Sequence, residues 1–278
     1  FVHINRVCPP DYEQALRMAV AREQNPKRRD AVQGYLMQCL SEKKEGELID
    51  SEPDMVVVFM RVGQDVRWAG FTGSLQEAVR EGIGRACAEF SLSSPSRDDA
   101  LPSSRFTAGR SFPVFIHWDL VPGEQVQLTV AARSGEDESK TRLLMKTSQE
   151  SIADRVLAQM NELRESIRFP FVLGIGVGGT VENAVLTARE CLNDPLNMAE
   201  LLDRGPQTSV ENLRTEIFRR LNEFSGDTGS FVLRPQVLDV KIRLRSDRYP
   251  VWPVCLMLET GILRRTRFVL DGTGPVFF

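Results

Sequence analysis

A glycine-rich run at residues 174–180 is the part of the sequence whose residue types and spacing point most directly to chemistry. In single letters it reads GIGVGGT, and its glycines are Gly174, Gly176, Gly178 and Gly179. Glycine lets a backbone turn tightly against a ligand, and the start of a helix presents free N–H groups to an anion. The spacing fits neither the dinucleotide-binding pattern nor the P-loop. The run therefore predicts a site for a carboxylate or phosphate, with a purely structural turn as the alternative.

Candidate acid–base groups are few, because the only histidines are His3 and His117. Two histidines exclude a metal site built on several imidazoles. His117 follows an apolar run and is a candidate catalytic residue, with a hydrogen-bonded core histidine as the alternative. Glu52 is the second candidate, because a buried carboxylate with a raised pKa can act as a general acid or base. A surface-loop residue ahead of Pro53 is its alternative.

Cationic side chains gather toward the end of the sequence. Arginine binds dicarboxylates through paired hydrogen bonds, so Arg264 and Arg265 are predicted to contact a substrate. A solvated strand face is the alternative. The acidic run Glu136-Asp137-Glu138 is predicted to be a solvated loop.

Composition and charge limit the possible functions. The 278 residues carry a net charge of −3, which disfavours a nucleic-acid partner. No apolar run approaches the roughly 20 residues of a membrane span, and the first ten residues do not resemble a secretory signal. Five widely spaced cysteines are predicted to be reduced, mostly buried thiols. We therefore expect a soluble cytoplasmic protein.

The elements that must position these residues follow an α+β order. Helical spacing predicts helices over 12–20, 30–40, 74–90, 148–167, 181–192 and 209–224. Apolar and β-branched runs predict strands over 55–62, 66–69, 112–120, 125–131, 169–175, 237–244, 254–258 and 268–270. We expect 55–62 to pair with 66–69, 112–120 to form a hairpin with 125–131, and the last three strands to form a closing sheet. Residues 91–110 are predicted to be a long loop.

The expected architecture is an N-terminal helical hairpin followed by an antiparallel or mixed sheet with flanking helices. We divide the chain into an N-terminal helical segment at 1–48 and an α+β core at 49–200. Residues 201–278 supply a C-terminal helix and closing strands of the same domain.

Several collinear segments resemble the α-region of the class I, iron–sulfur fumarase and L(+)-tartrate dehydratase family. Residues 170–192 match its apolar strand, glycine turn and alanine-rich helix, and 56–64 match its strand and turn. Residues 115–123 resemble its V-I-H and I-V-P-G segments, and 130–135 its V-A-P-K-G-G segment. The resemblance implies the family's fold and a hydro-lyase activity on a small hydroxy or unsaturated carboxylate. It also implies a β-like subunit or a homo-oligomer as partner.

The departures from the family pattern fall at its cluster ligands. Asp50, Arg168 and Thr260 stand where the resemblance places cysteines. No metal and no [4Fe–4S] cofactor are therefore expected, because an isolated Asp or Thr is a poor ligand for such a cluster. Arg168 is predicted to add positive charge to the anion site at the glycine run. Glu52 matches the Asp of the family motif.

Three functions stay open on this basis. The first is a divergent α-subunit-like hydro-lyase. The second is a catalytically inactive, fumarase-like binding or scaffolding protein without a cluster. The third is a cluster-independent enzyme that uses Glu52, His117 and arginines, and it requires these groups to converge on the glycine turn.

Overall fold

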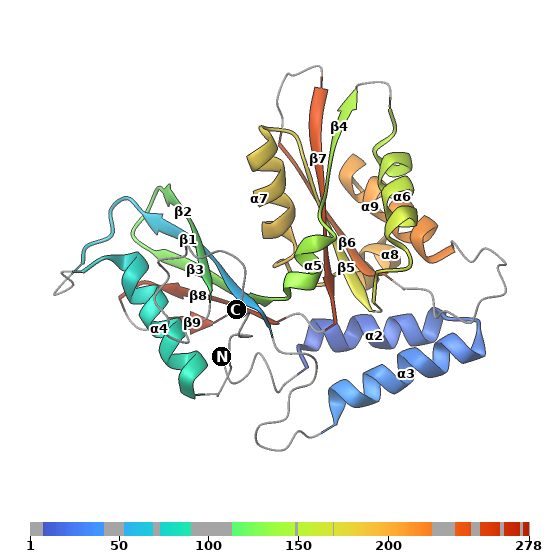
Figure 1. Ribbon diagram of the computed structural model, residues 1–278, viewed down its shortest axis with the longest axis horizontal. Helices are drawn as coiled ribbons and strands as arrows, with labels where there is room; N and C mark the ends of the chain where they lie inside the picture. Colours follow the sequence, from blue (N-terminus) through green and yellow to red (C-terminus); the bar gives the residue numbers. More distant parts are fainter. Residues whose placement is uncertain are drawn as a thin grey trace, which may run out of the picture. The chain divides into compact units, whose positions relative to one another are not determined.

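A computed structural model describes residues 8–41, 53–68, 73–89, 113–147, 150–168, 170–223, 237–245, 251–261, 264–272 and 275–277. These residues form helices and two mixed sheets, which confirms the predicted α+β class (Figure 1). The chain divides into two compact units, each assembled from separate stretches. Unit 1 comprises Phe1–Arg6, Lys43–Gly135 and Arg264–Phe278, and unit 2 comprises Val7–Glu42 and Glu136–Leu263. The division into 1–48, 49–200 and 201–278 stays a prediction.

The described residues of unit 1 form a five-stranded sheet covered by one helix. Its strands are β1 (Met55–Gly63), β2 (Val114–Val121), β3 (Val126–Arg133), β8 (Arg264–Leu270) and β9 (Pro275–Phe277), in the order β2-β1-β3-β8-β9. Alternate residues of β1, including Val58 and Met60, pack with Ile83 and Cys87 of α4 (Leu75–Glu89). The α4 face of the sheet is therefore the apolar core of unit 1.

The predicted hairpin between 112–120 and 125–131 is wrong. Both strands exist, but β1 lies between them, parallel to β2 and antiparallel to β3. The connection from β2 to β3 crosses the end of β1, where a Cβ on Gly63 would lie 2.2 Å from the carbonyl oxygen of Gly123. Residues 66–68 are not a strand and Ala69 lies outside the described residues, so the predicted pairing of 55–62 with 66–69 is wrong as well. Turn residues show that the chain reverses but not which strand occupies the space between.

Unit 2 contains a four-stranded sheet in the order β4-β7-β5-β6. The strands are β4 (Arg142–Thr147), β5 (Phe171–Val177), β6 (Val237–Leu244) and β7 (Val251–Thr260). The helices are α2 (Pro10–Arg22), α3 (Pro26–Leu40), α5 (Gly135–Ser139), α6 (Ile152–Leu163), α7 (Val181–Cys191), α8 (Met198–Arg204) and α9 (Ser209–Glu223). The predicted closing sheet is wrong, because β6 and β7 flank β5 while β8 belongs to unit 1. The pairs α2–α3 and β5–α7 form as predicted.

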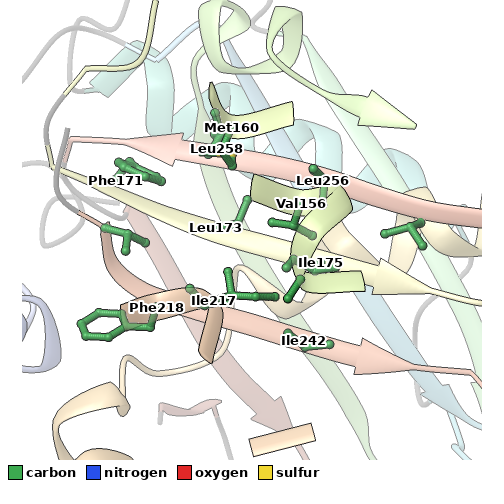
Figure 2. Close-up of a cluster of buried hydrophobic side chains, with 14 of the residues drawn as sticks. Val156, Met160, Phe171, Leu173, Ile175, Ile217, Phe218, Ile242, Leu256 and Leu258 are labelled. Carbon is green, nitrogen blue, oxygen red and sulfur yellow. The ribbon is translucent and has the colours of Figure 1, made fainter. Parts of the chain in front are cut away.

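Helices cover both faces of the unit 2 sheet. Figure 2 shows Val156 and Met160 of α6 and Ile217 and Phe218 of α9 gathered with inward side chains of β5, β6 and β7. All seven residues of β5 are buried, as expected for a central strand covered on both faces. The second face is covered by α7, and Gly174 and Gly176 make its close approach possible. A Cβ on Gly176 would lie 2.1 Å from the carbonyl oxygen of Ala184.

A buried ionic network joins α9 to β6. Asp239 is fully buried, and its carboxylate contacts Lys241 Nζ at 2.8 Å and Arg214 Nη2 at 3.0 Å. The backbone N–H of Asn197 donates to the same carboxylate at 2.8 Å. Arg214 and Lys241 also donate to Asn197 Oδ1 at 2.8 and 2.9 Å. Each charge thus has several partners, as a buried ion pair requires.

Candidate functional site

The face of the unit 1 sheet opposite α4 carries a row of polar side chains. Strand register aligns His117 on β2 with Phe59 on β1, Thr129 on β3 and Arg267 on β8. The His117 and Phe59 ring centroids are 5.2 Å apart, and Arg267 Nε donates to Thr129 Oγ1 at 3.3 Å. Three strand spacings place His117 and Arg267 about 14 Å apart at their Cα atoms. The row thus carries an imidazole and a guanidinium on one face of the sheet, at its two ends.

Arg264 and Arg265, both predicted to bind substrate, lie on opposite faces of that sheet. Arg265 is half-buried, pairs with Ala131 and shares the face of His117. Arg264 is buried and pairs with Ala132, so side-chain alternation places it on the α4 face. The structure therefore places His117 and Arg265 on one face of the sheet, three strands apart, and Arg264 on the other face. Glu52 lies outside the described residues.

Arg168 belongs to unit 2 and lies just before β5. Its Nη2 forms an ion pair with Glu136 Oε2 at 2.8 Å, and two-thirds of its side chain is exposed. Nearby on β7, Thr260 donates to Asp137 through its backbone N–H and its hydroxyl, both at 2.9 Å. Two of the positions matched to cysteines, Arg168 and Thr260, thus contact neighbouring residues of α5.

The glycine turn lies at the other end of β5. Gly178 and Gly179 have φ angles of 88° and 72°, which only glycine adopts easily, and Thr180 Oγ1 accepts from Asn183 N at the start of α7. The pKa of Glu182 is lowered, first by a hydrogen bond from its own backbone amide. The helix start thus already holds a carboxylate of its own chain. Seven strand residues, about 23 Å, separate this turn from Arg168, so the structure does not bring the two together.

The acidic run 136–138 is not a solvated loop, and this prediction is wrong. The run forms α5, and all three carboxylates have cationic or hydroxyl partners. Asp137 is 6% exposed, and burial raises its pKa against the opposing hydrogen bonds of Thr260. Glu138 forms paired hydrogen bonds with Arg189 at 2.6 and 2.7 Å. Sequence reasoning missed Asp137 because its partner Thr260 is more than 120 residues away along the chain.

A cleft of about 400 Å3 in unit 2 lies apart from all of these groups. Residues of α2 and α9 line it, among them Met18, Arg22, Phe218 and Arg219. None of the predicted site residues that the structure describes lines this cleft. In the described part of the chain, no helix is long and apolar enough to cross a membrane.

Comparison with known proteins identifies the family. The family model described as "Fumarate hydratase (Fumerase)" matches residues 1–269, so both units are included. The chain belongs to this family, which confirms the resemblance found in the sequence. It is also similar to "Putative L(+)-tartrate dehydratase subunit alpha" of Methanocaldococcus jannaschii, with 22% identity over 274 residues, covering 95% of this chain and 93% of that protein.

The described residues do not fit an iron–sulfur cluster. The guanidinium of Arg168 and the hydroxyl of Thr260 contact carboxylates and supply no thiolate. Burial raises the pKa of Cys191 and of Cys255 to about 12, so both remain thiols at neutral pH, whereas clusters bind thiolates. No group of three His, Cys, Asp or Glu residues suited to a metal occurs among the described residues. Asp50 lies outside them, so the absence of a cluster stays a prediction.

Asp137 and Glu211 are expected to affect stability with opposite pH dependence. Burial raises the Asp137 pKa above 3.8, so this residue's contribution to stability is present below pH 3.8 and is lost as the pH rises through the folded-state value. Hydrogen bonds from Arg204 first, and then from the Gln207 amide, lower the Glu211 pKa to about 2. Its contribution is present above pH 4.5 and is lost as the pH falls toward 2.

Urea unfolding of Asp137→Asn and Glu211→Gln beside the wild type, from roughly pH 3 to 7, measures this difference. As the pH rises, the wild type should lose stability relative to Asp137→Asn and gain stability relative to Glu211→Gln. Parallel pH profiles for the two variants would contradict the assignment.

Proposed function

We propose that this protein is a divergent hydro-lyase of the fumarase family that acts on a small hydroxy or unsaturated carboxylate. The observation that carries the proposal is the family match over residues 1–269, which retains both compact units. The similar protein of Methanocaldococcus jannaschii is described as an alpha subunit, which supports a β-like partner subunit for this chain too. A cytoplasmic location is part of the same proposal.

Reversible dehydration needs a base, an acid and a cationic site for carboxylates. A base removes a proton from the carbon next to one carboxylate. The electron pair of the broken C–H bond forms the double bond as the neighbouring C–O bond breaks. The hydroxyl leaves as water after it takes a proton from the acid. No step here depends on a metal group, since the described residues do not fit one.

The polar face of the unit 1 sheet supplies groups for these roles. His117 exchanges the proton with substrate, and Arg265, on the same face, binds a carboxylate through its planar guanidinium. Glu52 is proposed as the second acid–base group. Arg168 and the glycine turn remain proposed anion-binding groups, but they lie at opposite ends of β5 and would form separate subsites. Arg264 is buried on the α4 face, and its proposed role in substrate binding is to support β8, the strand that carries Arg265.

Substitutions on the polar face should reduce turnover without unfolding the protein. His117→Gln is expected to lower kcat at least 100-fold, because a positioned acid–base group contributes about 10²–10⁴-fold. Arg265→Gln should lower kcat/KM about 10- to 100-fold through weaker carboxylate binding, since a charge-assisted hydrogen bond is worth about 1.5–3 kcal/mol. Arg85→Gln, on the exposed surface of α4, is the matched control and should leave both constants unchanged.

The assay follows malate and L(+)-tartrate dehydration and fumarate hydration, with the chain alone and co-expressed with a β-like subunit. Full activity of both polar-face variants would reject the site. Carboxylate binding by calorimetry with no turnover in either preparation would favour the inactive binding protein instead.

A further inference from the structure

Strand β2 is an apolar edge of the unit 1 sheet. In the described part of the chain it has a strand neighbour, β1, on one side only. Three large apolar side chains of this edge are more than half exposed, namely Phe115 at 52%, Trp118 at 54% and Leu120 at 59%. A long, exposed and hydrophobic edge strand is a template for pairing with another strand, and proteins normally protect such an edge.

The backbone shows which residues of β2 point toward the open side. Val56 N donates to the Pro113 carbonyl at 2.9 Å, and Gln64 N donates to the Val121 carbonyl at 2.8 Å. Odd-numbered residues therefore direct their backbone groups to β1. Because these groups alternate along a strand, residues 114, 116, 118 and 120 direct their N–H and C=O groups to the open side.

These directions limit how β2 can pair with itself. In an antiparallel pair, residues that exchange hydrogen bonds lie opposite each other, so even-numbered residues must face even-numbered residues. Centring the pair on residue 117 would put His117 opposite itself, and centring it on 119 would oppose two Asp119 carboxylates. Centring it on Trp118 instead places His117 opposite Asp119, Ile116 opposite Leu120 and Phe115 opposite Val121. Of the three registers compared, this one avoids like pairs at His117 and Asp119 and places apolar residues opposite apolar residues.

We propose that two copies of this chain associate through antiparallel pairing of their β2 strands about a two-fold axis at Trp118. The two five-stranded sheets then form one continuous sheet. The pair of His117 with Asp119 of the second copy occurs twice, on the face that carries Arg265. A cross-strand carboxylate beside His117 orients its imidazole, so the second copy contributes a residue to the proposed active face. The interface itself does not depend on the proposed hydro-lyase function.

Cysteine cross-linking tests the register. In the proposed pair the two residues 118 lie opposite each other, with Cα atoms about 5.5 Å apart, within disulfide range. Residues 120 face residues 116, so two copies of residue 120 lie roughly 13 Å apart, beyond disulfide range. Trp118→Cys should therefore form a covalent dimer on mild oxidation, whereas Leu120→Cys and the wild type, with its own five thiols, should not.

Charge exchange tests the interface without cysteines. Sedimentation velocity should show a concentration-dependent dimer for the wild type. His117→Asp should weaken it about tenfold, because two pairs of carboxylates then oppose each other. Asp119→His should also weaken it, because it removes both carboxylates that face His117. The double variant His117→Asp/Asp119→His should restore it. Leu143→Lys, on the exposed edge strand β4 of unit 2, is the control and should leave dimerisation unchanged.

A wild type that stays monomeric at high concentration would overturn the proposal. A dimer that is indifferent to the β2 substitutions, or that is lost in Leu143→Lys, would also overturn it. An intact His117→Asp dimer would count against the interface, whereas the turnover of that variant tests only the active-site assignment.

Discussion

Gly176→Ala is expected to destabilise unit 2 by about 3 kcal/mol, because the added methyl group overpacks a filled interface. Its Cβ would lie 2.1 Å from the Ala184 carbonyl oxygen and 2.6 Å from the Ala188 backbone nitrogen. Both atoms belong to the backbone of α7, so the strain cannot be relieved by a side-chain rotation. The helix would have to move away from β5 and open a gap along the whole contact.

Gly34→Ala is the matched control in the same unit. Gly34 lies inside α3, and nothing lies within 4 Å of the Cβ that alanine would add. Replacing glycine by alanine in an open helix position should stabilise the protein by about 0.5–1 kcal/mol. Chemical denaturation of the wild type and of both variants measures the two changes in the free energy of unfolding. Equal effects of the two substitutions would mean that α7 does not rest on Gly176.

Asp239→Ala is expected to cost about 3–5 kcal/mol, since it leaves two buried cations without their shared carboxylate. The side chains of Lys241 and Arg214 are 5% and 12% exposed, so water cannot replace the lost partner. The Asn197 amide, which donates to the same carboxylate, loses its acceptor as well. The contacts that join α9, β6 and the segment before α8 should therefore weaken together.

Glu216→Ala serves as the comparison on α9. Its ion pair with Arg220 is 3.0 Å long, but both side chains are 40–49% exposed, and such pairs contribute about 0–1 kcal/mol. Asp239→Ala with an effect as small as that of Glu216→Ala would show that the network is compensated elsewhere. Protection of β6 amides from hydrogen exchange gives a local readout beside the global unfolding energy.

Local patterns in the sequence predicted elements well where one segment determines its own structure. The continuous apolar run of β5, the glycine turn and the helix after it were predicted because strand burial, glycine conformation and helical spacing act within about 20 residues. The neighbours of each strand in its sheet could not be predicted in the same way. The insertion of β1 between β2 and β3, and of β7 between β4 and β5, depends on pairings between residues 58 to 114 positions apart, which local patterns do not reveal.

The candidate site shows the same division. The face shared by His117 and Arg265 follows from strand alternation and register, and register was unknown until the strand order was known. The adjacent Arg264 and Arg265 seemed equivalent in sequence, but the two-residue repeat of a strand directs them to opposite faces. Asp137 was overlooked because a run of three carboxylates normally indicates solvent, and its hydrogen bonds with Thr260 on β7 depend on a distant part of the chain.

The stretches of the two units alternate along the chain, so unit 1 cannot be completed during synthesis until all of unit 2 has been made. The β3 edge of the unit 1 sheet is completed only by β8, which begins 129 residues after Gly135, and α2 cannot pack against β6 until that strand has been made. At about 5–20 residues per second, the unit 1 strands would remain an unfinished sheet for roughly 6 to 26 s. During that interval the nascent chain exposes apolar β-strands, so we expect its yield in cells to depend on chaperone capacity and translation speed more than its final stability would suggest.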